Sequence, residues 1–232
     1  MLLDFLFPKR CPICGDIVMP HGEDACPKCR LQIQYVEKPF CHKCGKPLVL
    51  SDEIYCNDCN AREHTFECGR AVFVYNDVMR RSIADYKYKH RREYASFYVQ
   101  EVLRTLGTEI KEWNADAIIP IPLHKSREQK RGFNQAEVLA KGIGEALKIP
   151  VCTDLVSRCK KTTAQKQLNN RERQNNLKKA FKIIGNDVKL KTVILCDDIY
   201  TTGSTMDTVA TLLKRSGVQE VYFIALAIGK GF

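Results

Sequence analysis

The amino-acid sequence predicts an α/β protein with a parallel sheet flanked by helices, preceded by a small cysteine-rich unit. Eight of the twelve cysteines form four C-x-x-C pairs before residue 70. After that point, apolar strands alternate with amphipathic helices, as in a layered parallel sheet. A length of 232 residues accommodates one core with a small appendage. We therefore expect two domains, at residues 1–68 and 69–232.

The cysteine pairs form an internal repeat. CPICGDIVMPHGEDACPKC and CHKCGKPLVLSDEIYCNDC begin 30 residues apart, and in each repeat eleven residues separate the two pairs. A glycine, Gly15 or Gly45, follows each leading pair and relieves strain in the tight turn around the sulfurs. Because four thiolates make a closed tetrahedral site, each repeat predicts a structural zinc ion rather than a catalytic one.

A redox C-x-x-C motif and an iron–sulfur centre are alternatives, but four pairs at matched spacing favour zinc. We expect each repeat to bind its own ion, with a cross-braced arrangement as the alternative. The predicted ligands are Cys11, Cys14, Cys26 and Cys29 for one ion and Cys41, Cys44, Cys56 and Cys59 for the other. His21, His42 and His64 can bind metal in principle, but eight cysteines already fill two sites. Cys68 stands alone and is not expected to be a ligand.

Cysteine use and hydropathy indicate the compartment. Paired thiols suited to a metal indicate a reducing environment. The longest apolar run, residues 221–228, is too short to span a bilayer. The N-terminal MLLDFLFPKR lacks a leading basic region and includes Asp4, unlike a signal peptide. We therefore expect a cytoplasmic protein with no membrane span, and its formal charge of +10 makes it basic.

The larger domain shows strands and helices in alternation. Strands are predicted at residues 71–75, 115–122, 191–196 and 221–228. Apolar side chains recur at helical spacing in four segments: Met79, Ile83 and Tyr86; Phe97, Leu103 and Leu106; Ala136, Leu139, Ile143 and Leu147; and Met206, Val209, Leu212 and Leu213. The last of these helices is expected to stop at Gly217. Because the strands are apolar on both faces, the sheet should be parallel and covered by helices on both sides.

A candidate ligand site follows the third predicted strand, in the stretch VILCDDIYTTGST. Asp197 and Asp198 lie just past the strand, where parallel sheets place their ligands. Thr201, Thr202, Gly203, Ser204 and Thr205 form a turn into the next helix, whose backbone N–H groups and hydroxyls can hold one phosphate. The chain has no G-x-x-x-x-G-K-[ST] motif. Carboxylates repel phosphate but accept hydrogen bonds from sugar hydroxyls, so the stretch predicts a sugar monophosphate ligand.

This stretch closely resembles the 5-phosphoribosyl-1-diphosphate (PRPP) binding motif of type I phosphoribosyltransferases. The whole chain resembles the ComF family of competence-associated phosphoribosyltransferase-like proteins, which includes GntX-like proteins. The resemblance covers nearly the full length and includes YKYKHRREYA, PIPLHKSREQKRGFNQAE, the segment containing Gln167, Arg171, Arg173 and Asn176, and the cysteine repeat. It implies a Rossmann-like type I phosphoribosyltransferase fold with an N-terminal double zinc ribbon. Cys196 and Tyr200 stand where small or aliphatic residues are more usual.

The resemblance also implies a role for each part of the site. Asp197 and Asp198 would hold the ribose hydroxyls, directly or through Mg²⁺, and residues 201–205 would hold the 5′-phosphate. Leu123, His124 and Lys125 follow an earlier strand, in the place of the pyrophosphate loop. Residues 162–181 resemble the loop that closes over pyrophosphate, with Arg171 as a catalytic residue and Arg173 as a second donor. Such cations would stabilise the negative charge that builds up on the leaving pyrophosphate.

Two basic segments raise the question of nucleic acid. Residues 80–92 combine six Lys and Arg residues with tyrosines, and residues 158–182 contain nine basic residues against one acid. Such segments attract phosphates and allow stacking on bases, although many basic helices are only solvated faces. The candidate nucleic-acid-binding residues are Lys87, Lys89, Arg91 and Arg92. The family's link to natural transformation strengthens an expectation of single-stranded DNA binding.

Two functions therefore remain open. One is a phosphoribosyltransferase, a member of the glycosyltransferase class, whose acceptor the sequence does not identify. The other is a non-catalytic scaffold of the competence machinery that binds PRPP and single-stranded DNA. The resemblance implies a ComF-operon DNA translocase as a protein partner, with the zinc units as the surface that meets it.

Overall fold

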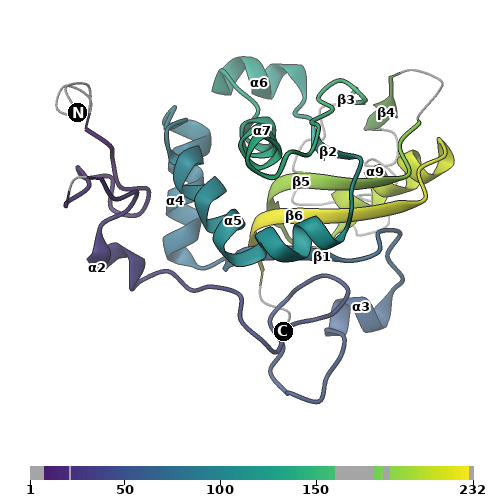
Figure 1. The fold of residues 1–232 in the computed structure, drawn as a ribbon, viewed down its shortest axis with the longest axis horizontal. Coiled ribbons are helices and arrows are strands. Elements are labelled where there is room, and N and C mark those ends of the chain that lie inside the picture. Colours follow the sequence, from purple (N-terminus) through teal and green to yellow (C-terminus); the bar gives the residue numbers. More distant parts are fainter. Residues whose placement is uncertain (1–7, 21, 160–179, 185–188, 230–232) are drawn as a thin grey trace, which may run out of the picture.

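The computed structural model describes residues 8–20, 22–159, 180–184 and 189–229. Its centre is a parallel sheet with the strand order β1-β6-β5-β2 (Figure 1). The strands are β1 (Gly69–Val74), β2 (Ala117–Pro120), β5 (Thr192–Tyr200) and β6 (Glu220–Ile228). Most of their residues are buried, which confirms the predicted sheet with apolar side chains on both faces.

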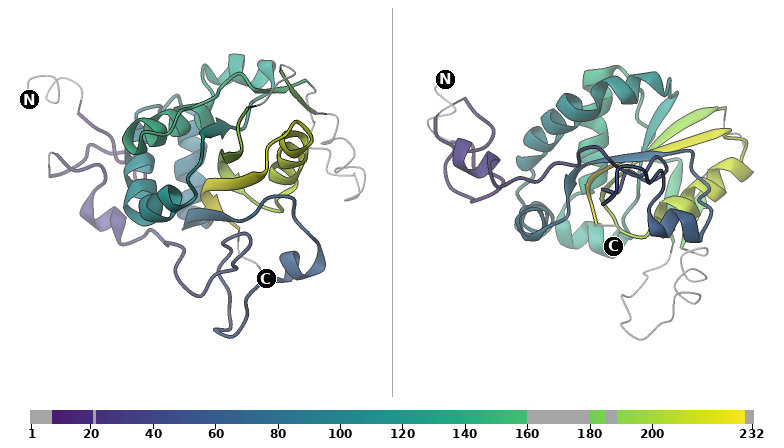
Figure 2. Two further views of the ribbon diagram at one scale, coloured as in Figure 1. Left: turned by 45° about the vertical axis from the view of Figure 1, so that its right-hand side comes forward. Right: turned by 90° about the horizontal axis from the view of Figure 1, so that it is seen from below.

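Alternate residues of the strands feed two separate hydrophobic clusters. On one face Ile194 and Ile224 pack with side chains of α4 (Asp77–Tyr88), α5 (Tyr94–Glu112) and α7 (Gln135–Leu147). On the other face Val193 and Phe223 pack with side chains of α9 (Ser204–Arg215) (Figure 2). The four predicted helices are thus present and cover both faces of the sheet.

Strand β5 is longer than the sequence predicts. It continues through Tyr200, so the two aspartates lie within its last residues and not after its end. The physical reason is that β6 runs alongside to the same point, with Asp197 opposite Ala225 and Tyr200 opposite Ile228. The prediction that the acids follow the strand is therefore corrected, whereas their position at the carboxyl edge of the sheet is confirmed.

Three further elements lie outside the main sheet. Helix α6 (Lys125–Arg131) follows β2 after a short loop. Strands β3 (Val156–Arg158) and β4 (Phe181–Ile183) form a separate antiparallel pair. Between these two strands the structure describes only Cys159 and Ala180.

The two cysteine repeats lie on different parts of the larger domain (Figure 1). The first repeat, with α2 (Pro27–Arg30), packs beside α5, where Arg30 Nη1 lies 2.6 Å from Glu101 Oε1. The second repeat, with α3 (Asn57–Ala61), packs at the start of β1, where Gly69 N donates to Lys43 O at 2.9 Å. Residues between the repeats pair with β1, since Val74 N donates to Gln34 O at 2.8 Å.

Both hydrophobic clusters include residues from the two predicted domains. The cluster around α5 contains Cys11 and Val18, and the cluster around α9 contains Cys41 and Phe66. The boundary at residue 68 therefore separates segments that share their cores. In the part of the chain that the structure describes, no helix is both long and apolar enough to cross a membrane.

Candidate functional site

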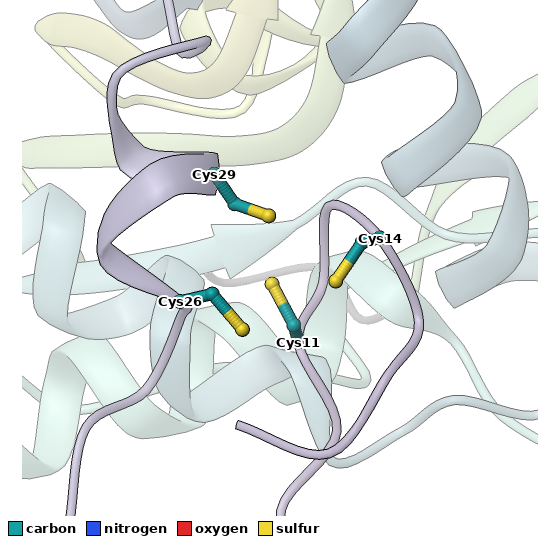
Figure 3. Close-up of side chains that lie close together, drawn as sticks. All are labelled: Cys11, Cys14, Cys26 and Cys29. Carbon is teal, nitrogen blue, oxygen red and sulfur yellow. The ribbon is translucent and has the colours of Figure 1, made fainter. Parts of the chain in front are cut away.

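The cysteines form two separate groups of four. In each group the four sulfur atoms lie within 4.8 Å of one another, and Figure 3 shows those of the first group pointing toward a common centre. In the second group Cys44 Sγ and Cys56 Sγ are 3.6 Å apart. A tetrahedral zinc ion with Zn–S bonds of about 2.3 Å requires sulfurs about 3.8 Å apart, so the geometry fits zinc. The groups are the two sequential repeats, which confirms the predicted ligand sets over a cross-brace.

The local backbone explains why both repeats fold alike. Gly15 N donates to Cys11 O at 2.9 Å, and Gly45 N donates to Cys41 O at 2.8 Å. Both glycines have positive φ, 82° and 76°, as the sequence pattern predicts. Gly45 has a second constraint, because a Cβ there would lie 2.8 Å from Gly69 O. The turn after Cys44 in the second repeat therefore lies directly against Gly69, the first residue of β1.

The acid pair lies at the carboxyl end of β5. Asp198 is 5% exposed, and its Oδ2 lies 2.8 Å from Lys87 Nζ of α4. Asp198 N donates to Asp197 Oδ1 at 2.8 Å. Burial, together with the neighbouring charge of Asp198, raises the pKa of Asp197 to about 7. At neutral pH Asp197 therefore carries only part of a full negative charge.

Lys87 differs from what the sequence predicts. We expected it on an exposed basic face that contacts nucleic acid, but its side chain is only 13% exposed and pairs with Asp198. Helix α4 ends beside the carboxyl edge of the sheet, which directs this lysine inward. Lys87 therefore belongs to the acid site.

Arg158, which the sequence pattern did not single out, interacts electrostatically with Asp197 and with a second arginine, Arg127. The pKa of Arg158, at the end of β3, is lowered overall. Burial and the charge of Arg127 lower it, and the charge of Asp197 opposes them. Arg127 belongs to α6, within the PIPLHKSREQKRGFNQAE segment. In the sequence, Arg158 is only the first residue of the basic segment 158–182. The number of basic residues in that segment does not indicate which acid Arg158 interacts with.

Residues 201–205, the predicted phosphate loop, lead into α9. Gly203 has φ +75° and precedes Ser204, the first residue of the helix. Thr202 Oγ1 and Ser204 Oγ lie 3.0 Å apart, and Thr201 and Thr202 are exposed. The loop therefore presents hydroxyls and free helix N–H groups at the positive end of a helix, an arrangement that attracts a phosphate.

The predicted pyrophosphate loop lies at the end of the neighbouring strand. β2 pairs in parallel with β5, with Pro120 opposite Cys196, so the loops that follow both strands leave the same edge. His124 caps α6, its Nδ1 accepting from Ser126 N at 3.2 Å, and Lys125 is exposed. Leu123 is half-buried beside them. Arg171 and Arg173 lie outside the described residues.

The RGFNQ stretch, residues 131–135, has a structural role that the sequence did not reveal. Arg131 is 7% exposed and donates to Gln135 Oε1 at 2.8 Å and to Tyr88 Oη at 3.0 Å. Tyr86 Oη donates to Gln135 O at 3.1 Å. The two tyrosines flank Lys87 in the sequence, so this network fixes the end of α4 that carries the lysine.

The class of this protein follows from its sheet and site. The parallel sheet has an acid pair at the end of one strand and a turn into a helix after it, as in a phosphoribosyltransferase-type domain, and the domain is joined to a double zinc ribbon. Comparison with known protein families gives the same two parts. Residues 101–231 match the phosphoribosyl transferase domain family, and residues 2–60 match the double zinc ribbon domain family.

Three relatives share most of this chain. Competence protein F of Haemophilus influenzae is 30% identical over 231 residues, which cover 95% of this chain and 97% of that protein. Competence protein ComFC of Bacillus subtilis is 29% identical and is matched over 84% of this chain and 80% of its own. DNA utilization protein YhgH of Escherichia coli is 31% identical, over 80% of this chain and 82% of its own. The chain therefore belongs to the Competence protein F (ComF) family of phosphoribosyltransferase-domain proteins with a double zinc ribbon.

Proposed function

We propose that this protein binds PRPP with Mg²⁺ and acts in DNA uptake, either transferring or sensing the phosphoribosyl group. The observation that supports this most is the pairing of two features on one strand: the acids at the end of β5 and the loop around Gly203. A phosphate and a sugar with vicinal hydroxyls match these two features. The names of the relatives, competence and DNA utilization proteins, support the process.

In this proposal each group has a defined task. The 5′-phosphate takes the N–H groups and hydroxyls of residues 201–205, and the ribose hydroxyls donate to Asp197 and Asp198. The carboxylate oxygens also suit Mg²⁺, which would neutralise charge on the pyrophosphate. The pyrophosphate would meet the positive charge of Arg158, whose pKa the charge of Asp197 raises, and of Arg127, which acts on Arg158. Because Lys87 already neutralises Asp198, ligand binding must either retain or displace that ion pair.

The competing function is a scaffold that binds PRPP and single-stranded DNA without turnover. Exposed basic side chains support it, but several are neutralised locally. Lys89 pairs with Asp85 at 3.0 Å, Arg91 with Glu93 at 3.4 Å, and Arg80 with an acid of its own helix. The surface is therefore less positive than the sequence count suggests, which favours weak DNA binding.

The remaining parts of the proposal concern location and organisation. Free thiols that bind zinc require a reducing compartment, so we place the protein in the cytoplasm. We also propose residues 1–68 as the zinc-binding part and residues 69–232 as the PRPP-binding part. A ComF-operon DNA translocase is the proposed protein partner.

Calorimetric titration with PRPP and Mg²⁺ tests the ligand. The double variant Asp197→Asn, Asp198→Asn should lose at least about ten-fold in affinity, because amides replace the charged acceptors of the ribose hydroxyls. Asp77→Asn is the matched control, since Asp77 is an exposed acid of α4 whose side chain is 84% exposed. Equal affinity of the wild type and the double variant would refute the assignment. Mass spectrometry of reactions with candidate acceptors then separates turnover from binding.

A further inference from the structure

The space behind the phosphate loop is filled by two aromatic rings. A Cβ at Gly203 would lie 2.5 Å from Tyr200 Oη and 3.1 Å from Cε1 of His64. Tyr200 ends β5, whereas His64 belongs to the segment that leaves the second cysteine group. The backbone of the loop therefore lies directly on a side chain from the zinc-binding part of the molecule.

The same segment is hydrogen-bonded to the first turn of α9. His64 Nδ1 lies 2.8 Å from Asp207 Oδ2, and Thr65 N donates to Asp207 Oδ1 at 3.0 Å. An ionised carboxylate only accepts, so the imidazole donates its Nδ1–H. One turn further on, the hydroxyls of Thr65 and Thr211 are 3.1 Å apart. Both oxygens of Asp207 are thus occupied by residues that follow the second cysteine group.

Aromatic packing continues this contact to the sheet and to the metal site. The His64 ring stacks on Phe66 at 4.7 Å, and Phe66 meets Tyr200 edge-on at 6.3 Å. Tyr200 in turn stacks on Phe223 of β6 at 4.6 Å. Phe66 and Tyr200 belong to the same buried cluster as three cysteines of the second group, Cys41, Cys44 and Cys56.

The first cysteine group has different neighbours. Cys11 and Cys29 belong to the cluster formed with α4, α5 and α7, on the other face of the sheet from α9. Its Cys14 is exposed, whereas Cys41, Cys44 and Cys56 of the second group are all buried. The two metal sites have the same kind of ligands. The first packs with α4, α5 and α7, and the second packs in the cluster that contains α9.

We propose that His64 is a positioning residue for the phosphate loop, and that metal binding at Cys41, Cys44, Cys56 and Cys59 holds it there. Loss of the metal from this group frees residues 62–66, so Asp207 loses two donors and Gly203 loses the ring behind it. The loop then opens, and its N–H groups no longer converge. Metal in the first group has no such effect. The inference rests on the proposed function only for the identity of the anion.

Two cysteine variants test the difference between the metal sites. Cys59→Ser and Cys14→Ser each remove one partly accessible ligand, and zinc content should fall from two ions to one in both. Amide hydrogen exchange of residues 201–205 should accelerate by about ten-fold or more in Cys59→Ser and stay unchanged in Cys14→Ser. Affinity for inorganic phosphate, measured by calorimetry, should fall in the same variant only. Equal effects of the two substitutions would overturn the proposal.

His64 variants keep the test independent of metal loss. His64→Ala should accelerate exchange at residues 201–205 and weaken phosphate binding by about ten-fold, while zinc content stays at two. His64→Asn places an amide donor near the position of Nδ1 and should recover part of the loss. His42→Ala, at an exposed histidine inside the second cysteine repeat, is the control. Wild-type exchange and binding in His64→Ala would overturn the inference. If the wild type binds neither phosphate nor PRPP but its loop responds as described, the proposed function fails and the positioning role stands.

Discussion

The ion pair between Lys87 and Asp198 lies almost entirely out of water, with side chains 13% and 7% exposed. A charge in such a place is tolerated only while its partner remains, because desolvation without compensation is expensive. The two residues come from α4 and β5, more than a hundred positions apart in the chain. Spacing in the sequence therefore gave no sign of the pair, although it singled out Asp198 as a candidate site residue.

Removal of Lys87 should destabilise the protein far more than removal of a surface lysine. Lys87→Met should lower the free energy of unfolding by about 3 kcal/mol, because Asp198 is left buried and unpaired. Lys89→Met is the matched control: its pair with Asp85 involves a 66% exposed lysine and should contribute about 0–1 kcal/mol. Adding Asp198→Asn to Lys87→Met should restore most of the loss. Urea denaturation measures all three, and equal losses for the two lysine variants would contradict the buried pair.

The pKa of Asp197, raised to about 7, predicts a pH dependence with a defined sign. An ordinary aspartate has a pKa near 3.9, so between about pH 4 and about pH 7 the folded state holds a proton that the unfolded chain has lost. The protonated carboxyl of Asp197 therefore contributes to the free energy of unfolding fully below about pH 4, and this contribution is lost as the pH rises through about 7. Binding of a ligand that needs the ionised acid should strengthen over the same upper range.

Carboxyl-carbon NMR of the free protein measures this titration directly. Asp197 should titrate with an apparent midpoint near pH 7, and Asp198→Asn should move this midpoint downward because it removes the neighbouring negative charge. A midpoint near 4 in the wild type would show that Asp197 is fully ionised at neutral pH.

At the scale of elements, the sequence predicted every strand of the main sheet and its four large helices. These elements bury apolar residues at a regular period, as Met206, Val209 and Leu213 do in α9. It did not predict α6, whose sequence KSREQKR has no apolar periodicity. The short strands β3 and β4 were missed for a related reason, since three residues are too few to show alternation. The positions of such elements depend on tertiary contacts.

Asn134 joins two of these elements and provides a test of the RGFNQ stretch. Its Oδ1 accepts from Ala136 N at 3.1 Å at the start of α7, and its Nδ2 donates to Ile121 O at 3.2 Å after β2. Asn134→Ala should cost about 2 kcal/mol of unfolding free energy, the sum of a lost cap and an unsatisfied buried carbonyl. Asn134→Ser keeps a side-chain oxygen that can accept from Ala136 N and should cost less. Chemical denaturation tests this order, and an alanine variant as stable as the serine variant would contradict it.

At the scale of the whole molecule, the zinc-binding repeats are not appendages of an independent sheet. Each contributes buried side chains to one of the two cores, and residues 34–36 cover the outer edge of β1. The sequence indicated the repeats and their ligands because cysteine spacing is a local signal. It could not indicate where the repeats dock, because that depends on single contacts such as Gly45 against Gly69 and His64 against Gly203. The sequence also could not indicate which of the six basic residues in 80–92 are exposed. One of them, Lys87, is a largely buried partner of Asp198.

Binding of single-stranded DNA should therefore be detectable but weak, and it should depend on the exposed basic residues without Lys87. The triple variant Lys89→Ala, Arg91→Ala, Arg92→Ala retains the Lys87–Asp198 pair and so should leave PRPP affinity unchanged. Each phosphate neutralised on a single strand contributes about −0.7 to the slope of log K against log salt, so the variant should lose at most about 2 units of slope. Pairing of Lys89 with Asp85 and of Arg91 with Glu93 makes a smaller loss the expected result.

Fluorescence anisotropy on a labelled oligonucleotide over a salt series measures the slopes of the wild type and of the triple variant. A wild type that shows no salt-dependent binding at low ionic strength would remove direct DNA contact from the proposed function. The exposed positive charge would then serve a protein partner, and the transferase alternative would be favoured.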